Sequence, residues 1–183
     1  MNHEQSLKVI EEADCLADKE AVEAALDRMA IDITRDLENK SPLVFCVMNG
    51  GMIVTGQLLT RLVFPLEVGY LHASRYGRNT TGGELTWKAE FQADVRGRTV
   101  LLVDDILDEG HTLKALSDEC LRRGAARVLT AVLVDKLHDR KVEPGYRADF
   151  TGMEIPDRFV FGYGLDYNGI WRNAPGIYAV KGM

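Results

Sequence analysis

The chain has 183 residues, with 22 Lys and Arg against 28 Asp and Glu, and a formal net charge of -6. This length predicts a single domain over residues 1–183, and 46% hydrophobic residues can form a core, which argues against a disordered chain. The acidic balance also argues against a general binder of nucleic acids or membranes, because such proteins need a basic face.

The three cysteines, Cys15, Cys46 and Cys120, lie far apart, so they form neither a disulfide framework nor a Cys-x-x-Cys metal pair. Charged residues stand where a secretory signal would be apolar, and no run of about 18 apolar residues could span a membrane. We therefore expect a cytoplasmic protein. Cys46 and Cys120 lie in apolar or helical patterns, which predicts packing rather than reactive thiols.

The first half of the chain alternates helical and strand patterns. Apolar residues at three- and four-residue steps predict an amphipathic helix from Lys19 to Leu37. The apolar run Leu43 to Met48 predicts a buried strand that stops at Asn49-Gly50-Gly51. Residues 53–63 then favour a helix and residues 66–73 a strand, before a polar stretch.

The second half contains the clearest unit. Thr99 to Asp104 is a nearly continuous apolar strand, Thr112 to Arg123 is a helix closed by Gly124, and Arg127 to Val134 is another apolar strand. Strand, helix and strand in this order, with strands apolar on both faces, predict a mostly parallel sheet covered by helices. The predicted fold class is therefore α/β.

Beyond Lys136 the chain is more irregular. Only short β-like stretches occur there, at residues 159–161 and 177–180, among three of the prolines. No repeat, low-complexity tract or linker divides the chain.

Ligands of open parallel sheets bind at the carboxyl ends of the strands, and the loop after Val103 is the most informative of these ends. It contains several carboxylates and then Gly110 and Thr112 at a helix start, where backbone N–H groups and the helix dipole favour an anion such as phosphate. The carboxylates would repel that anion unless a cation or sugar hydroxyls lay between them. The combination indicates a phosphorylated sugar with a divalent metal.

Two common phosphate motifs do not account for this loop. Residues 51–56 have the glycine spacing of a P-loop, but Gln57-Leu58 stands where its Lys and Ser or Thr belong. Gly162, Gly164 and Gly169 do not form the G-x-G-x-x-G turn of a dinucleotide site. The sequence therefore supports neither an ATP site of that type nor a nicotinamide cofactor.

Residues 100–112, Val-Leu-Leu-Val-Asp-Asp-Ile-Leu-Asp-Glu-Gly-His-Thr, resemble the signature for 5-phosphoribosyl-1-pyrophosphate (PRPP) of type I phosphoribosyltransferases. Val134-Asp-Lys136, the segment 155–168 and Arg172 are similar to the hypoxanthine-guanine members of that family. The likeness extends from about Leu43 to Arg172. It implies a central, mostly parallel sheet with a small hood formed by the terminal regions.

The resemblance implies roles within the signature. Asp104 and Asp105 match acidic residues that bind ribose hydroxyls directly or through Mg²⁺, and adjacent carboxylates suit a diol and a hard cation. The implied 5′-phosphate loop comprises Asp108, Glu109, Gly110, His111 and Thr112. Asp108 also matches the general acid/base beside purine N7. From its position alone, capping of the following helix is the favoured role of Asp108.

Other matches concern the base and Mg²⁺. Lys136 matches a donor to purine O6, which favours 6-oxopurines over adenine; the alternative is a surface lysine. Phe159 matches an aromatic that stacks on the base, with core packing as the alternative, and Val160 a backbone carbonyl that reads the base edge. Asp166 matches a Mg²⁺-linked carboxylate and Arg172 a guanidinium that contacts pyrophosphate, with an internal salt bridge as the alternative.

Two loops match less closely. Met48-Asn49-Gly50-Gly51 corresponds to a pyrophosphate loop with a non-proline cis peptide, and Asn49 and Gly50 are its implied ligands. The family more often has lysine at the place of Asn49, so backbone binding is retained without a direct charge contact. The segment from Ser74 corresponds to the family's lid, with its Ser-Tyr pair matched to Ser74 and Tyr76 and interrupted by Arg75.

Two further departures lie in the phosphate loop. Glu109 stands where a hydroxyl residue is common, and its charge near the phosphate weakens PRPP binding unless the side chain points away. His111 stands where lysine or asparagine is frequent.

The implied function is purine salvage by a cytoplasmic glycosyltransferase. Phosphoribose passes from PRPP to N9 of hypoxanthine or guanine with Mg²⁺, giving IMP or GMP and pyrophosphate. The expected partners are PRPP, a 6-oxopurine base and a second copy or three further copies of the chain, and neither nucleic acid nor a membrane. The alternatives are a relative that prefers xanthine or another base, and a nucleotide-sensing regulator that keeps the fold.

Overall fold

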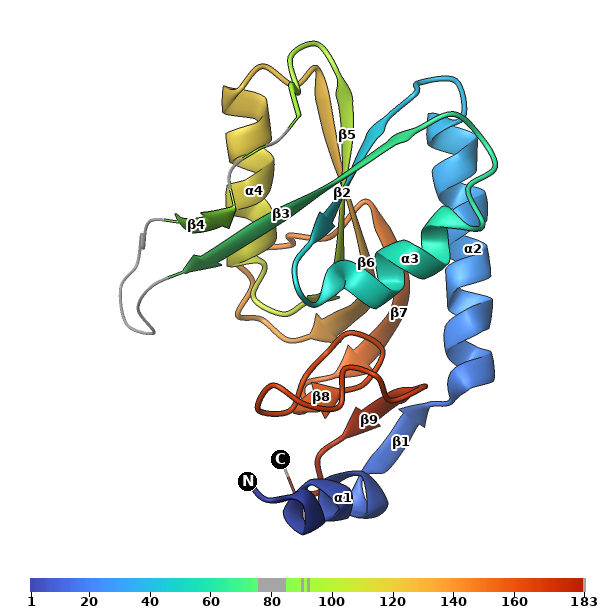
Figure 1. The fold of residues 1–183 in the computed structure, drawn as a ribbon, viewed down its shortest axis with the longest axis vertical. Helices are drawn as coiled ribbons and strands as arrows, with labels where there is room; N and C mark the ends of the chain where they lie inside the picture. Colours follow the sequence, from blue (N-terminus) through green and yellow to red (C-terminus); the bar gives the residue numbers. More distant parts are fainter. Residues whose placement is uncertain (76–84, 90, 92, 183) are drawn as a thin grey trace.

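A computed structural model describes residues 1–75, 85–89, 91 and 93–182 of the chain (Figure 1). In chain order its elements are α1 (His3–Glu12), β1 (Asp14–Ala17), α2 (Lys19–Leu37), β2 (Leu43–Val47), α3 (Gly51–Leu59), β3 (Glu67–Arg75), β4 (Leu85–Ala89), β5 (Thr99–Leu107), α4 (His111–Arg122), β6 (Arg127–Leu137), β7 (Phe150–Pro156), β8 (Val160–Phe161) and β9 (Ile177–Ala179). They form two sheets, one above the other in Figure 1.

The larger sheet has six strands in the order β4-β3-β2-β5-β6-β7. Neighbours from β3 to β7 pair in parallel, and only the edge strand β4 is antiparallel. This confirms the predicted α/β class and its mostly parallel sheet. The central strands β2 and β5 pair in register from Leu43 with Val100 to Cys46 with Val103, so their carboxyl ends meet at one edge.

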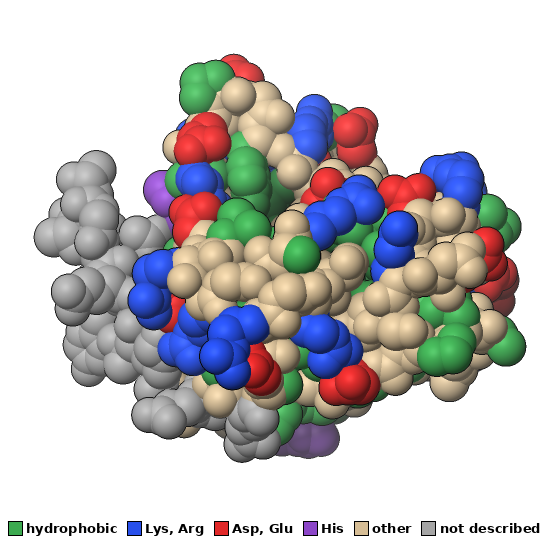
Figure 2. Space-filling model, turned by 90° about the horizontal axis from the view of Figure 1, so that it is seen from above, with side chains coloured by type: hydrophobic (Ala, Val, Ile, Leu, Met, Phe, Trp, Pro, Cys, Tyr) green, Lys and Arg blue, Asp and Glu red, His purple; other side chains and the backbone are tan. Residues whose placement is uncertain are grey.

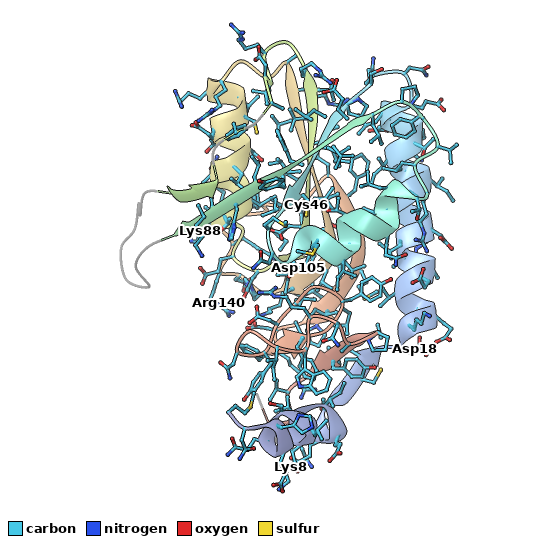
Figure 3. The ribbon with its side chains drawn as sticks, viewed as in Figure 1. Lys8, Asp18, Cys46, Lys88, Asp105 and Arg140 are labelled. Carbon is cyan, nitrogen blue, oxygen red and sulfur yellow. The ribbon has the colours of Figure 1, made fainter. Side chains whose placement is uncertain are left out.

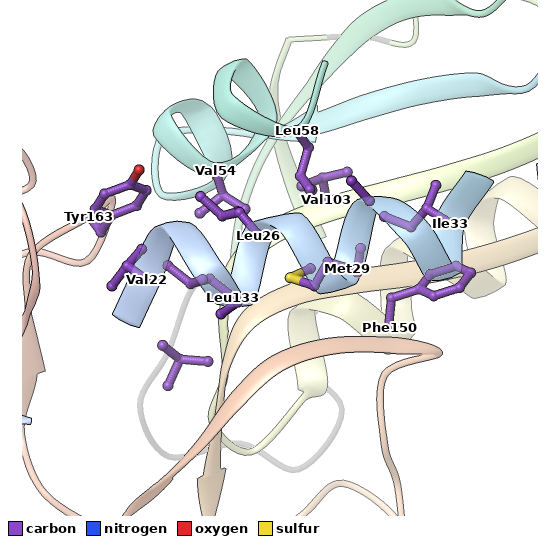
Figure 4. Close-up of a cluster of buried hydrophobic side chains, with 14 of the residues drawn as sticks. Val22, Leu26, Met29, Ile33, Val54, Leu58, Val103, Leu133, Phe150 and Tyr163 are labelled. Atoms are coloured by element: carbon purple, nitrogen blue, oxygen red, sulfur yellow. The ribbon is translucent and has the colours of Figure 1, made fainter. Parts of the chain in front are cut away.

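Successive residues of the central strands point to opposite sides of this sheet. Apolar side chains therefore lie on both faces, and helices cover both of them. In β5, Leu101 and Val103 pack in the cluster formed with α2 and α3, whereas Val100 and Leu102 pack in the cluster formed with α4. Helix α2 has the predicted bounds, and its buried side chains face α3 and the strands (Figure 4). The three- and four-residue spacing of apolar residues in the sequence therefore identified the face of α2 that packs in the core.

The smaller sheet is the hood expected from the terminal regions. Its order is β1-β9-β8, and both pairings are antiparallel, so it joins the beginning of the chain to its end. Helix α1 lies below it in Figure 1. The indole Nε1 of Trp171 donates to the carbonyl of Ser6 at 2.8 Å, which ties α1 to the segment between β8 and β9.

One helix is placed differently from the prediction. α3 begins at Gly51 and ends at Leu59, whereas a helix over 53–63 was expected. Pro65 disfavours helical backbone at the residue before it, so an earlier end is sterically reasonable. Leu62 is buried and Val63 is 92% exposed, so this connection still contributes to the core through Leu62.

Four elements were missed by the sequence analysis: α1, β1, β4 and β7. α1 has a capping box between Asn2 and Gln5, but it buries none of its residues and so shows little apolar spacing. β7 forms a sheet edge and contains Gly152, Glu154 and Pro156, which weaken a strand pattern.

The surface seen from above has basic and acidic side chains close together (Figure 2). At the amino ends of the large sheet, Arg98 pairs with Glu67 at 3.0 Å and Arg127 with Asp36 at 4.0 Å. Basic side chains are therefore accompanied by acidic ones on this face. No helix among the described residues combines the length and the apolar character needed to cross a membrane.

The three cysteines are free thiols, as predicted. Cys46 and Cys120 are buried, and burial raises the pKa of the Cys46 thiol and raises that of Cys120 to about 12. Both side chains therefore remain protonated packing groups at neutral pH.

Candidate active site

The predicted site loop is shaped by a strand that runs further than expected. β5 continues past Asp104 and Asp105 to Leu107, and β6 continues to Leu137. Their parallel register pairs Leu107 with Asp135, so the next residue of each strand, Asp108 and Lys136, comes to the same edge. Two residues 28 positions apart in sequence thereby meet in space.

A cavity of about 410 Å³ opens at this edge. It is lined by the ends of β2, β3 and β5 and by the first turn of α4, through Val47, Met48, Ala73, Asp104, Asp105, Ile106, Asp108, Glu109, Gly110, His111, Thr112 and Leu113. All seven residues predicted for the ribose-phosphate site line this one cavity. The cavity therefore lies at the carboxyl ends of the strands, where ligands of open parallel sheets were expected, and ligand binding there stays a prediction.

Asp104 and Asp105 form a closely packed acidic pair. Burial raises the pKa of Asp104 well above its usual range, and the charge of Asp105 raises it further. Burial also raises the pKa of Asp105, against a hydrogen bond involving Asp104 and the charge of Arg172, which both lower it. The pair therefore carries negative charge that the surrounding protein only partly neutralises.

Two glycines allow other segments to approach Asp105, which lies between α3 and the hood in Figure 3. A Cβ atom on Gly50 would lie 2.1 Å from Oδ2 of Asp105. A Cβ atom on Gly164 would lie 2.3 Å from the carbonyl oxygen of Gly50 and 3.2 Å from Cβ of Asp105. The loop after β2, the strand β5 and the hood therefore touch at a point where a side chain would not fit.

Arg172 connects this pair to the hood. Its Nη1 atom lies 3.8 Å from Oδ2 of Asp105 and donates to the carbonyl of Gly164 at 2.5 Å. Its Nη2 atom forms an ion pair with Oδ1 of Asp166, whose other oxygen accepts from the backbone N–H of Gly169 at 2.7 Å. The internal salt bridge weighed for Asp166 and Arg172 is thus present, and the pyrophosphate contact of Arg172 stays a prediction.

The acidic pair has the chemistry of a site for a hard cation. Carboxylate oxygens are the ligands that Mg²⁺ prefers, and a cation would offset the burial that raises both pKa values and the charge of Asp105 that raises the pKa of Asp104 further. Arg172 stands between Asp105 and the third predicted ligand, Asp166. Among the described residues, no three acidic, histidine or cysteine side chains gather as a metal cluster, so a cation here would also need ligands from the substrate.

The phosphate loop ends at an uncapped helix terminus. Gly110 is the N-cap of α4 at φ +87°, and no side chain in the described part of the chain caps the helix. The alternative that Asp108 caps this helix is therefore wrong. The two unusual residues of the loop, Glu109 and His111, approach each other at 3.5 Å, so the extra carboxylate has a basic neighbour. Backbone N–H groups at the α4 terminus are thus available to an anion.

Asp108 is held by two side chains from the far end of β6. Its Oδ2 accepts from Nζ of Lys136 at 3.0 Å, and its Oδ1 lies 2.7 Å from Nε2 of His138. Burial favours a raised pKa for Asp108, but the hydrogen bonds from His138 and Lys136, together with the charge of Lys136, outweigh it and lower the pKa. Lys136 is buried, so the surface-lysine alternative is wrong.

The proposed base-binding residues of the hood lie on and beside β8. Phe159 is 45% exposed and meets Tyr167 edge-on, with ring centroids 5.7 Å apart, so the core-packing alternative does not hold. Val160 is buried, and its backbone pairs with Ala179 of β9. An exposed ring next to a fixed strand can present a flat face to a base.

The remaining predicted positions lie in two loops. The Met48–Asn49 peptide bond is cis, as the resemblance implied, and Asn49 is exposed. Tyr76 of the predicted lid lies outside the described residues, and so does the side chain of Ser74, so their roles stay predictions.

The sequence analysis missed the groups that support Asp108. Besides His138, these are Lys141 and Asp135, whose side chains are 8% and 1% exposed. Nζ of Lys141 donates to Asp135 at 2.7 Å and to the carbonyls of Leu107, Asp108 and Lys136 at 2.7–2.9 Å. The available signal was the cluster of basic and imidazole residues directly after an apolar strand.

Comparison with known proteins agrees with this geometry. Residues 12–168 match the family model "Phosphoribosyl transferase domain". A Streptococcus pneumoniae hypoxanthine-guanine phosphoribosyltransferase is 35% identical over 167 residues, which cover 91% of this chain and 92% of that protein. A Staphylococcus aureus hypoxanthine phosphoribosyltransferase structure superposes with a TM-score of 0.88 at 27% identity, covering 99% of this chain and 96% of that one.

A structure named hypoxanthine-guanine-xanthine phosphoribosyltransferase superposes with a TM-score of 0.79 at 26% identity, covering 94% of this chain and 97% of that one. The fold, the matched segments and these relatives agree with one another. The chain therefore belongs to the hypoxanthine-guanine phosphoribosyltransferases of the type I phosphoribosyltransferase family.

Proposed function

We propose that the chain acts in purine salvage and transfers the 5-phosphoribosyl group of PRPP to N9 of hypoxanthine or guanine, giving IMP or GMP and pyrophosphate. One observation carries this proposal: an acidic pair, of which Asp105 is buried, and an uncapped helix N-terminus line the same cavity. The first suits a polyol and a cation, the second an anion, and PRPP has all of these features when Mg²⁺ accompanies it.

The acidic pair binds the sugar. Asp104 and Asp105 accept hydrogen bonds from the ribose 2′ and 3′ hydroxyls. Backbone N–H groups at the start of α4 and the hydroxyl of Thr112 bind the 5′-phosphate. The cis peptide loop at Asn49 and Gly50 faces the pyrophosphate with backbone groups, and Arg172 contributes its guanidinium from the hood. When bound, Mg²⁺ neutralises charge on the departing pyrophosphate.

The base enters between the hood and the end of β6. Phe159 stacks on it, the backbone of Val160 reads its edge, and Lys136 donates to O6. As the bond from N9 to the sugar C1 forms, the bond from C1 to pyrophosphate breaks and its electron pair leaves with the pyrophosphate. The proton on N7 passes to Asp108 as general base.

The two sheets work together as one catalytic domain in this proposal. The hood supplies Phe159, Asp166 and Arg172, and the large sheet supplies the acidic pair and Asp108. Their contact at Asp105, Gly50 and Gly164 supports this division, because a shift of the hood would move Arg172 away from the sugar site.

Nucleotide formation tests the proposal directly. Separate reactions contain PRPP, Mg²⁺ and hypoxanthine, guanine, xanthine or adenine, with a control that lacks Mg²⁺. We expect IMP and GMP only with Mg²⁺, and no AMP, because the 6-amino group of adenine offers Lys136 no acceptor. XMP in the third reaction would widen the base range toward that of the xanthine-using structural relative.

Two results would overturn the proposal. AMP formed as fast as IMP would remove the role of Lys136 at O6. PRPP binding without any nucleotide product would favour the regulator alternative, and would direct attention to the departures at Asn49, Arg75 and Glu109.

A further inference from the structure

His138 is a buried imidazole to which the proposed reaction assigns no step. It lies just beyond β6, its side chain is 4% exposed, and its Nε2 atom is 2.7 Å from Oδ1 of Asp108. Its other nitrogen, Nδ1, accepts the backbone N–H of Arg140 at 3.0 Å. Both ring nitrogens of His138 are thus engaged inside the protein.

The second contact fixes the protonation state of the ring. A nitrogen that accepts an N–H must present its lone pair, so Nδ1 carries no proton and the proton of a neutral imidazole is on Nε2. Nε2–H then donates to Oδ1 of Asp108. An imidazolium would direct a second N–H at the N–H of Arg140, which this geometry disfavours. His138 is therefore a neutral donor with a fixed tautomer.

The two oxygens of Asp108 have partners of different kinds. Oδ1 is held by a ring fixed at both nitrogens, whereas Oδ2 accepts from Lys136, an ammonium at the end of a flexible chain. When Lys136 turns to the base, Oδ2 loses its donor while Oδ1 keeps its own. The carboxylate then retains its orientation at the moment when Oδ2 must face the base.

We propose that His138 is a positioning residue for the reaction: its Nε2–H holds Oδ1 of Asp108, so that Oδ2 receives the N7 proton once Lys136 has turned to the purine. This inference rests on the proposed function. The proton passes from N7 to Oδ2, and His138 keeps its own proton throughout. The ring thus acts through Asp108 and does not touch the base.

Other charged groups surround Asp108, and none replaces this contact. Lys141 donates to the backbone carbonyl of Asp108 and not to its carboxylate. Arg140 is paired with Asp157 at 2.7 Å and lies at the outer edge of the molecule in Figure 3. Four further titratable groups share its loop and cavity: Glu109, His111, Asp104 and Asp105.

The test compares two substitutions of His138 in the full-length enzyme. His138→Gln keeps an N–H donor near the position of Nε2, and His138→Leu keeps bulk without a donor. Arg140→Ala is the matched control, because it removes the exposed side chain and keeps the backbone N–H that fixes the ring. For each variant, kcat, KM for PRPP and kcat/KM for hypoxanthine are measured against pH.

We expect His138→Leu to lower kcat/KM for hypoxanthine about tenfold or more, as loss of a supporting hydrogen bond commonly does. The acidic limb of its profile should move upward by about one pH unit, because Asp108 loses a donor that favours its ionised form. KM for PRPP should stay within about twofold, because the substitution leaves in place the backbone N–H groups and the Thr112 hydroxyl that bind the phosphate. His138→Gln should recover most of the rate and the wild-type limb, and Arg140→Ala should match the wild type.

Two outcomes would overturn the inference while the wild type remains active. One is an unchanged rate and acidic limb in His138→Leu. The other is an equal loss in both His138 variants with no movement of the limb, which would indicate only a packing role. An inactive wild type would instead overturn the proposed function.

A spectroscopic measurement tests the tautomer without using activity. Long-range ¹H–¹⁵N spectra of the labelled protein should show Nδ1 of His138 unprotonated and Nε2 protonated, with the assignment made from the missing signals of His138→Gln. The opposite tautomer or an imidazolium at neutral pH would contradict the inference even if the enzyme is active.

Discussion

The segment from Asp104 to Asp108, at the end of β5, holds acidic side chains in opposite electrostatic environments at its two ends. At the first end, burial raises the pKa values of Asp104 and Asp105, and Arg172 is shared with Asp166. At the second end, Asp108 receives hydrogen bonds from Lys136 and His138 that lower its pKa despite burial. Only Ile106 and Leu107 separate a partly compensated pair from a compensated carboxylate.

This difference shows how one short loop can perform two tasks. The charge of the acidic pair is only partly neutralised by the protein, so the pair favours ligands that bring positive charge or hydroxyl donors. The charge of the Asp108 carboxylate is compensated by its hydrogen-bond donors before any ligand binds. Asp108 therefore remains ionised and can accept a proton when Lys136 turns to the base. The neighbouring strand β6 makes the difference, because its end supplies donors to Asp108 and none to the pair.

The largest effect is expected when the compensated end loses its charge. Asp108→Asn should slow IMP formation by about 10²- to 10⁴-fold, the usual contribution of a general acid/base. Circular dichroism and KM for PRPP should stay close to wild type, because backbone groups hold the loop. Near-normal turnover would remove Asp108 from the proton transfer.

The next test removes the support behind Asp108. Lys141→Met takes a buried ammonium away from Asp135 and from three backbone carbonyls. Because it breaks a buried ion pair, the substitution should lower the free energy of unfolding by about 3–5 kcal/mol. Urea denaturation monitored by fluorescence measures it. The control is Lys114→Met, whose partners Asp118 and Glu143 are exposed, and it should change little. Equal effects of both variants would contradict the role of burial.

A steric change sharpens the comparison from the uncompensated end. Gly50→Ala would place Cβ 2.1 Å from Oδ2 of Asp105, so the carboxylate must move. A displacement of about 1 Å in a catalytic site can lower kcat/KM about 100-fold. We expect that loss in kcat/KM for PRPP. Gly56→Ala is the control within α3, because nothing lies within 4 Å of its Cβ. It should keep the activity and stabilise the helix slightly. A Gly50→Ala enzyme with wild-type kinetics would mean that Asp105 does not need this position.

The smallest expected effects are changes in the free energy of unfolding, and these should have opposite signs for Asp105 and Asp108. Asp105→Asn should raise the free energy of unfolding at pH 7 by about 1 kcal/mol while abolishing PRPP binding, because it removes a charge that the fold disfavours. That gain should begin to decline as pH falls through the raised pKa of Asp105, and should vanish below the ordinary pKa of an aspartate, where the carboxyl is protonated in both the folded and the unfolded protein.

Asp108→Asn should instead lower stability at pH 7. The loss should be less than about 1 kcal/mol, because the half-exposed carboxylate is screened by water. It should disappear as pH falls below the lowered pKa of Asp108, where the wild-type carboxylate is also neutral. Thermal melts of both variants between acidic and neutral pH measure the two signs, and equal signs would contradict the comparison.

Much of the fold could be predicted because its central elements have strong local patterns. The helix Lys19–Leu37 and the apolar strands around Leu43 and Val100 bury one or both faces, so their periods are visible in sequence. Elements with little burial were not visible, as α1 shows. The ends of β5 and β6 were also missed, because pairing between the strands extends both beyond their apolar cores.

The candidate site divides in the same way. The sequence alone determined that carboxylates, Gly110 and Thr112 follow a buried strand, since these residues are neighbours along the chain. Only the tertiary structure decided that Asp108 meets Lys136 and His138, 28 and 30 residues away, and that Asp104 and Asp105 receive no such partner from that strand. The physical reason is that a carboxylate's pKa depends on burial and on nearby charges, and strand register and burial determine both.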